Sequence, residues 1–189
     1  LLQTVESLSM MVEKRDPYTA GHQKKVCQLA CAIGSEMNLN DKIKGGIYIA
    51  SILHDIGKIS IPAEYLSKPG FLDPNEMTII KGHPQVAYDM LKSIDFDTPV
   101  MDIVRQHHEK CNGSGYPCGL KAPDILLEAR IITVADVVEA ISSHRPYRPA
   151  LGIDKALEEI SSNAGILYDR DVVEICVDLF RNKGFMFKV

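Results

Sequence analysis

The segment most informative about the fold is LEARIITVADVVEAISS, residues 127–143. Its apolar residues recur with helical periodicity, which predicts one strongly hydrophobic helix over this range. Asp136 breaks the pattern, because it follows Ile132 by four positions and Ala129 by seven and so shares their apolar face. An aspartate on such a face more often caps a helix or forms a salt bridge. Burying a lone carboxylate is otherwise costly unless it binds a metal, which makes Asp136 a candidate functional residue.

Helical periodicity extends over almost the entire chain. No segment alternates with the period of two that a strand requires, so the prediction is an all-α bundle in a single domain, residues 1–189. Asn40 is a candidate N-cap, and Asp73, Pro74 and Glu76 are typical of the first residues of another helix. The expected helices cover about residues 5–15, 26–37, 41–54, 74 onward, 84–91, 98–108, 127–143, 153–163 and 170–182, the last two followed by Gly165 and Gly184. A long Gly- and Pro-rich loop is expected at 109–126, and such loops are often functional.

The composition limits the class of protein. With 189 residues, 46% of them hydrophobic, the chain is long enough for one domain with a real core and too apolar to be disordered. No apolar run approaches the ~18–20 residues of a membrane span, so no membrane contact by this domain is expected. A net charge of −4 argues against a nucleic-acid polymer as partner. Because the chain starts at Leu1 rather than Met, we expect a fragment of a longer protein.

The five cysteines predict neither a disulfide scaffold nor a structural zinc site, since their number is odd and no CxxC pair occurs. Cys27 and Cys31 lie four positions apart on an expected helix and are interpreted as buried free thiols. Cys111 is interpreted as structural. This cysteine usage fits a reducing cytoplasm.

Histidines and aspartates at helix ends give the main chemical signal. His54-Asp55 closes one expected helix and His107-His108 closes another, where the helix end lets neighbouring side chains enter one pocket. A single histidine is more often a surface or core residue, and His144, beyond a helix end, is interpreted as solvated. The other five histidines with two aspartates, and without thiolates, form a ligand set for Fe, Mn, Co, Ni or Zn. Five histidines and two aspartates are enough to bind two metal ions with one carboxylate bridging them. Pairs of metal ions recur in enzymes that catalyse phosphoryl transfer.

The ordered series of motifs closely resembles the HD-GYP family of bacterial signalling phosphodiesterases over nearly the whole chain. The stretches that carry the resemblance are HHE at 107–109, GSGYP at 113–117, DPYTAGHQKKV at 16–26, HDIGK at 54–58, KPG at 68–70, HP at 83–84, LEARIITVAD at 127–136 and RPYR at 145–148. It implies an HD-type helical domain that hydrolyses cyclic di-GMP to linear pGpG, with GMP as a potential later product, by two-metal-activated hydroxide attack. Fe or Mn is the favoured metal, with Ni, Co and Zn as alternatives.

Carried over position by position, the resemblance implies two ions and a bridge between them. The implied ligands are His22, His54 and Asp136 for one ion, His83, His107 and His108 for the other, and Asp55 as the bridge. Asp55 and Lys58 are the implied catalytic residues. Lys58 would reach the scissile phosphate and either stabilise charge or protonate the leaving oxygen, and a solvated lysine is the alternative.

Further substrate contacts are implied around the GYP loop and the RPYR stretch. Gly115 would permit close approach to a ligand, and Tyr116 would either pack under the loop or contact substrate. Arg145 and Arg148 match a phosphate-contacting pair, for which guanidinium groups are well suited, although an exposed arginine is the default interpretation.

Two positions depart from the family pattern. Some members bind a third metal through a glutamate one helical turn before the first histidine, where this chain has Tyr18, so a binuclear centre is expected. The GYP motif often begins with aspartate, and Asn112 keeps the carbonyl acceptor but loses the charge.

Two alternatives stay open. The same centre could act on cyclic GMP-AMP, on pGpG or on another nucleotide, because the sequence does not locate the base-recognition contacts. The chain could instead be a non-catalytic module that binds a cyclic dinucleotide or a protein, although the complete ligand set argues against this. Expected partners are a cyclic dinucleotide, an upstream sensor or receiver domain, diguanylate cyclase-type proteins and a second copy in a homodimer. The expected location is the cytoplasm, with the domain tethered to a sensor in the full-length protein.

Overall fold

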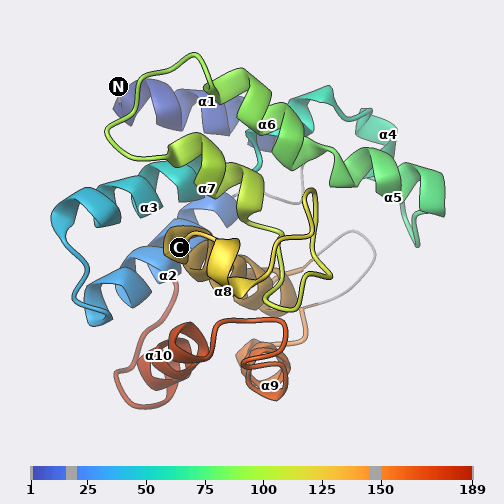
Figure 1. The fold of residues 1–189 in the computed structure, drawn as a ribbon. Coiled ribbons are helices and arrows are strands. Elements are labelled where there is room, and N and C mark those ends of the chain that lie inside the picture. Colours follow the sequence, from blue (N-terminus) through green and yellow to red (C-terminus); the bar gives the residue numbers. More distant parts are fainter. Residues whose placement is uncertain (1, 16–20, 145–149, 189) are drawn as a thin grey trace.

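The protein is described by a computed structural model that covers residues 2–15, 21–144 and 150–188 (Figure 1). Within these ranges the regular structure is helical, without strands beyond two isolated bridges, which confirms the all-α prediction. In chain order the elements are α1 (Leu2–Arg15), α2 (His22–Glu36), α3 (Asp41–Leu53), the 3-10 helix η1 (Ile56–Ser60), α4 (Ala63–Leu66), α5 (Pro74–Lys81), α6 (His83–Leu91), α7 (Val100–Gln106), the 3-10 helix η2 (Ala122–Asp124), α8 (Leu127–Ser142), α9 (Ile153–Ser162) and α10 (Arg170–Arg181).

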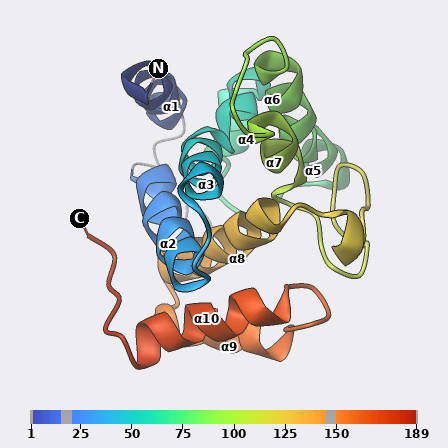
Figure 2. The ribbon, with the colours of Figure 1, turned by 60° about the vertical axis from the view of Figure 1, so that its left-hand side comes forward.

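Helix α8, the stretch that decided the fold class, lies at the centre of both ribbon views (Figures 1 and 2). It packs against α2, α3 and α7 and also against the pair formed by α9 and α10. The aliphatic side chains of these helices fill the interior, and burying each one contributes ~1.5–3 kcal/mol. The largest fully buried ones include Leu29, Ile33, Ile47, Leu53, Ile103, Ile131, Ile132 and Ile160.

The predicted capping residues act as expected. The side chain of Asn40 accepts a hydrogen bond from the Ile43 N–H at 3.0 Å. Asp73 and Glu76 form a reciprocal capping box at the start of α5. Helix α2 begins earlier than the apolar pattern indicated, because Gly21 adopts a positive φ of 76° and turns the chain into the helix at His22. The short helices η1 and α4 were not predicted, since neither is long enough to show a period.

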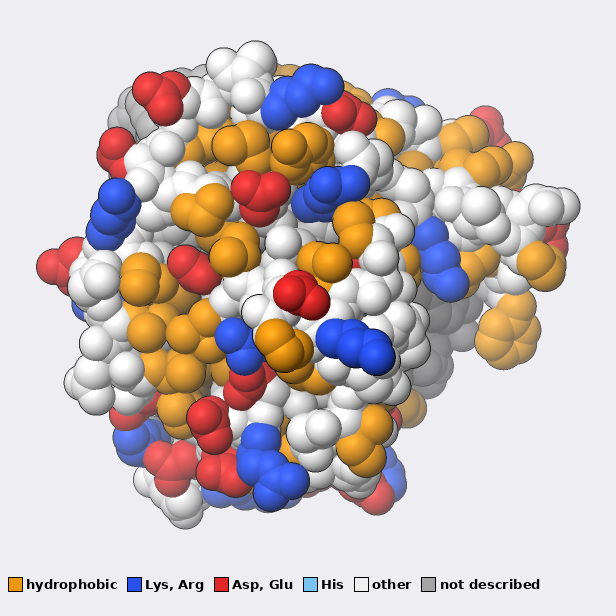
Figure 3. All heavy atoms as spheres, in the orientation of Figure 1, with side chains coloured by type: hydrophobic (Ala, Val, Ile, Leu, Met, Phe, Trp, Pro, Cys, Tyr) orange, Lys and Arg blue, Asp and Glu red, His pale blue; other side chains and the backbone are white. Residues whose placement is uncertain are grey.

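An arm formed by α4 and α5 projects from the body of the molecule (Figure 1). Neither helix contains a buried residue, and Phe71 between them is 96% exposed. Acidic and basic side chains are interspersed over the face shown in Figure 3, with apolar side chains between them. None of the helices in the described ranges has the length and apolar character needed to cross a membrane.

Candidate metal centre

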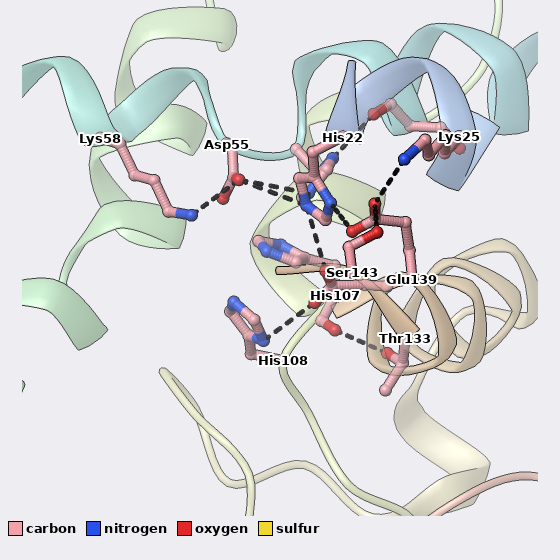
Figure 4. Close-up of polar contacts among 12 residues, drawn as sticks. His22, Lys25, Asp55, Lys58, His107, His108, Thr133, Glu139 and Ser143 are labelled. Carbon is pink, nitrogen blue, oxygen red and sulfur yellow. Dashed lines mark hydrogen bonds and ion pairs between the residues drawn. The ribbon is translucent and has the colours of Figure 1, made fainter. Parts of the chain in front are cut away.

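The predicted histidines and aspartates converge from five helices on one buried site (Figure 4). His22 and His83 are the first residues of α2 and α6, His54 and His107 directly follow α3 and α7, and Asp136 lies on α8. The residues form three groups, and within each group the ligand atoms lie within 4.8 Å of one another. The groups are His22, His54 and Asp136; His83, His107 and His108; and His54, Asp55 and His107. The structure therefore brings together all seven residues that the resemblance implied.

Three of the rings are oriented by the same backbone device. The Nδ1 atoms of His54, His83 and His107 each donate to the carbonyl oxygen three residues earlier, at 2.7, 2.8 and 2.5 Å. Because a carbonyl oxygen can only accept, Nδ1 carries the proton and Nε2 keeps its lone pair. The His22 ring is held instead between two carboxylates, with its Nδ1 2.6 Å from Glu139 Oε2 and its Nε2 3.3 Å from Asp136 Oδ1.

The Nε2 atoms of these rings face one another. Nε2 of His83 lies 3.3 Å from Nε2 of His107, and Nε2 of His54 lies 3.3 Å from Nε2 of His22. The lone pairs of His83 and His107 repel each other at this separation, whereas a cation between them would be bound by both. Neutral imidazoles with carboxylates and no thiolate suit a divalent transition metal. The donor set thus fits the metal ions that the sequence implied.

Asp55 lies between the two groups of ligands. Its Oδ1 is 3.4 Å from His83 Nε2, and its Oδ2 is 3.5 Å from His54 Nε2 and 3.7 Å from His22 Nε2. The ammonium of Lys58 lies 2.7 Å from Oδ2. Burial acts to raise the pKa of Asp55, but Lys58 and the surrounding imidazoles hold that pKa well below its usual range. The carboxylate is therefore ionised and presents one oxygen toward each group.

Burial favours the neutral form of four histidines of the site. It lowers the pKa of His83 to about 4 and that of His108 to about 3, against the opposing effect of nearby carboxylates. The pKa values of His54 and His107 are also lowered, again chiefly by burial. Neutral imidazole is the form that binds a metal, so the site is prepared for a cation over the neutral pH range.

We expect the metal-free protein to lose stability steeply as the pH falls from about 6.5 to 4. In this window the unfolded chain protonates these histidines while the folded chain does not, so the free energy of unfolding decreases with decreasing pH. Each such histidine contributes about 1.4 kcal/mol per pH unit. Urea unfolding at a series of pH values measures the slope, which a His83→Gln variant should reduce by about one proton. A slope near zero would contradict neutral histidines in the folded state.

Gly57 allows the segment that carries Asp55 to approach α6. A Cβ atom on Gly57 would lie 2.0 Å from the carbonyl oxygen of His83 and 2.8 Å from the amide nitrogen of Ala87. Real Cβ atoms do not approach backbone atoms so closely, and only glycine fits. The glycine of the HDIGK stretch therefore places His83 beside Asp55.

Buried Glu109 holds the GYP loop against the site. Its carboxylate accepts hydrogen bonds from the backbone N–H groups of Cys118 at 2.7 Å and Leu120 at 2.9 Å. A Cβ on Gly115 would lie 2.4 Å from the Cα of Glu109, so this glycine is required by the loop's own backbone. The ring of Tyr116 stacks on His108, with centroids 4.7 Å apart, at the edge of the metal centre.

Replacing Glu109 with alanine is expected to release the loop. Two backbone donors would lose a charged acceptor, which costs about 2–3 kcal/mol of stability. Hydrogen exchange at the Cys118 and Leu120 amides should accelerate, while metal content stays unchanged because no predicted ligand is altered. Unchanged protection of both amides in Glu109→Ala would show that the carboxylate does not hold the loop.

Other predictions about single residues have mixed outcomes. Arg145, Arg148 and Tyr18 lie outside the described residues. Asn112 keeps the acceptor role expected of it, since its Oδ1 accepts from the Ser114 N–H at 3.0 Å. His144 is exposed, as expected. The described cysteines are all free: Cys27 and Cys176 are buried, Cys31 and Cys111 are half-buried, and Cys118 is exposed.

Sequence reasoning missed Glu139, which is 2% exposed and bonds His22. A signal was present, because Glu139 follows Asp136 by three positions and so lies one turn further along the same face of α8. Its charge made it look like an ordinary solvent-facing residue of an amphipathic helix. Only the packing of α2 against α8 shows that the carboxylate is buried.

Comparison with known proteins agrees with this geometry. A family model described as HD domain matches residues 6–172. The chain belongs to the HD domain family. The resemblance drawn from the motifs is therefore confirmed. This chain is 38% identical over 183 residues to a cyclic di-GMP phosphodiesterase of Thermotoga maritima. The matched region covers 95% of this chain and 49% of the relative.

Relatives named as 3′3′-cGAMP-specific phosphodiesterases also match. This chain is 36% identical over 159 residues to 3′3′-cGAMP-specific phosphodiesterase 3 of Vibrio cholerae. The matched region covers 84% of this chain and 35% of that protein. The chain thus spans half or less of the length of these curated relatives. A crystal structure of a cyclic GMP-AMP specific phosphodiesterase of V. cholerae superposes with a TM-score of 0.72 at 19% identity, covering 95% of this chain and 48% of that one. This likeness shows a shared fold.

Proposed function

We propose that this chain is a metal-dependent phosphodiesterase that hydrolyses cyclic di-GMP to linear pGpG, with GMP as a potential further product. The observation that carries the proposal is the pairing of histidine Nε2 atoms 3.3 Å apart, with the Asp55 carboxylate between the two pairs. The names of the relatives from Thermotoga maritima and Vibrio cholerae support a cyclic dinucleotide as the substrate class.

We propose that the two outer groups of ligands each hold one ion. In this assignment His22, His54 and Asp136 hold the first ion, His83, His107 and His108 hold the second, and Asp55 contacts both. When bound, two divalent ions supply Lewis-acid chemistry that lowers the pKa of a water and neutralises charge on a phosphate. Fe or Mn is the proposed metal, and Ni, Co and Zn suit the same donors.

Lys58 provides a positive charge at the edge of the centre. Its Nζ lies 2.7 Å from Asp55 Oδ2, and its side chain is 18% exposed. An ammonium here would stabilise the negative charge that develops on the scissile phosphate, and it could pass a proton from Nζ to the leaving oxygen. Asp55 would keep this lysine charged and oriented until substrate binds.

The GYP loop is proposed to form one wall of the substrate site. Tyr116 stacks on His108, and the ammonium of Lys81 lies 5.5 Å from the centroid of its ring, so a ribose or a base would meet the tyrosine beside these two side chains. Gly115 would act indirectly, by letting the loop approach the backbone at Glu109. Contacts of Arg145 and Arg148 with phosphate remain predictions.

We also propose several wider properties of the protein. They are a single domain over residues 1–189, a cytoplasmic location, an upstream sensor or receiver domain, diguanylate cyclase-type partners and a homodimer. The free cysteines motivate the location, because disulfides are rare in a reducing compartment. Tests of these proposals require the full-length protein.

The function is tested by loading metal-free protein with Mn²⁺, or with Fe²⁺ under anaerobic conditions, and supplying cyclic di-GMP, 3′3′-cGAMP and pGpG separately. Chromatography of the products should show linear pGpG from cyclic di-GMP. Faster turnover of 3′3′-cGAMP would favour that substrate instead, since one relative is named for it. Binding without turnover of any dinucleotide would contradict the proposal and favour a non-catalytic module.

A further inference from the structure

Glu139 occupies a buried position directly behind one of the proposed ligands (Figure 4). Its Oε2 accepts the Nδ1 proton of His22 at 2.6 Å, and its Oε1 accepts from the Ser143 hydroxyl at 2.6 Å. The ammonium of Lys25, one turn after His22 on α2, lies 3.7 Å from Oε1. These contacts from α2 and from the end of α8 fix the carboxylate, whose side chain is only 2% exposed.

The ring of His22 is oriented by a charge, which distinguishes it from its neighbours. His54, His83 and His107 donate their Nδ1 protons to the neutral carbonyls of Ser51, Ile80 and Val104. A carboxylate behind an imidazole makes the opposite nitrogen a stronger donor to a metal, and it adds Coulomb attraction for a cation. Of these four rings, His22 is the one with a carboxylate behind it, and the Lys25 ammonium at 3.7 Å from Glu139 offsets that charge only in part.

The two groups of proposed ligands consequently differ in charge. The group of His22, His54 and Asp136 contains one carboxylate and has a second one, Glu139, behind its histidine. The group of His83, His107 and His108 consists of three imidazoles that burial keeps neutral, and Asp136 lies further from it, 3.9 Å from His108 Nδ1 against 3.3 Å from His22 Nε2. Asp55 faces both groups and does not distinguish between them.

We propose that Glu139 is a positioning residue that makes the two metal sites unequal. The site of His22, His54 and Asp136 binds its ion more tightly and fills first, and the all-histidine site fills second. This inference rests on the metal centre of the proposed function. In this inference Glu139 affects metal affinity and does not contact the substrate.

Titration of metal-free protein with Mn²⁺ against a competing chelator tests the inference. The wild-type protein should bind two ions in two steps of different affinity. Glu139→Gln keeps the size and an acceptor for His22 but removes the charge, so it should weaken the tighter step by about 10–100-fold and leave the weaker step unchanged. Glu128→Gln makes the same chemical change in the first turn of α8, away from the ligands, and should alter neither step.

Equal affinities of both steps in the wild type, or unchanged affinities in Glu139→Gln, would overturn the inference. If Glu139→Gln does not fold, ¹⁵N NMR of the histidine rings in the wild-type protein decides instead. With one equivalent of Zn²⁺, His22 should carry its proton on Nδ1 and show the metal-bound shift at Nε2, whereas His83 should not be metal-bound. Metal on His83 first would contradict the proposed order of filling.

These measurements do not use turnover, so they separate this inference from the proposed function. A protein that binds two ions unequally and depends on Glu139, but hydrolyses no dinucleotide, would support the inference and contradict the function. A protein that hydrolyses cyclic di-GMP with unchanged metal affinities in Glu139→Gln would do the reverse.

Discussion

An Asp55→Asn variant is expected to lose roughly 10³-fold in kcat/KM for cyclic di-GMP while keeping its helical structure. The two carboxylate oxygens of Asp55 face both groups of histidines, at 3.4–3.7 Å. Asparagine has a similar shape but replaces one oxygen with an NH₂ group. That group would point at an unprotonated ring nitrogen or at Lys58, and the negative charge that both proposed ions share would be lost.

The matched control for this variant is Asp95→Asn, which makes the same chemical change at an exposed position between α6 and α7. Product formation and metal content are measured together for both variants. Asp95→Asn should behave as the wild type, and Asp55→Asn should lose activity and hold less metal. Full activity in Asp55→Asn would show that the carboxylate does not take part in the centre.

The second large effect is expected for Gly57→Ala, far larger than its single added methyl group suggests. The new Cβ would meet the His83 carbonyl oxygen at 2.0 Å and the Ala87 nitrogen at 2.8 Å, and both belong to backbone that cannot rotate aside. Helix α6 must then move away from η1. We expect a loss of about 3 kcal/mol in the free energy of unfolding, at the upper end for overpacking, and a loss of metal because His83 moves with α6.

Gly45→Ala provides the control within the same protein. Gly45 lies in the exposed face of α3, and a Cβ there would meet no atom within 4 Å. Alanine at a helix-interior glycine should stabilise the protein by about 0.5–1 kcal/mol. Denaturant unfolding of both variants should therefore give changes of opposite sign. A neutral effect of Gly57→Ala would contradict the close contact between η1 and α6.

Local signals made the helices predictable. The capping residues Asn40 and Asp73 bond the backbone as their types suggest, because a cap depends only on residues within one turn. Asp136 was recognisable because a carboxylate on an apolar face has few structural explanations. The pairs at 54–55 and 107–108 stood out because each ends an amphipathic helix.

The remaining features depend on contacts between segments far apart in the chain. The role of Gly57 follows from a helix that begins 26 residues later, at His83. Glu109 is buried because the loop at 109–126 folds back over it. The periodicity of apolar residues does not predict such a contact. Glu139 is buried only because α2 packs on α8 and places His22 against it. In each case tertiary packing, rather than local propensity, decides the role.

The metal content of protein purified without chelators reports directly on the two proposed metal sites. If seven histidines and aspartates hold a pair of cations, elemental analysis of the fresh protein should find about two equivalents of iron or manganese per chain. Replacing His22 or His83 with alanine should reduce this to about one equivalent, because each residue belongs to a different group. Protein that retains no metal, even after incubation with Mn²⁺ or anaerobic Fe²⁺, would contradict the account.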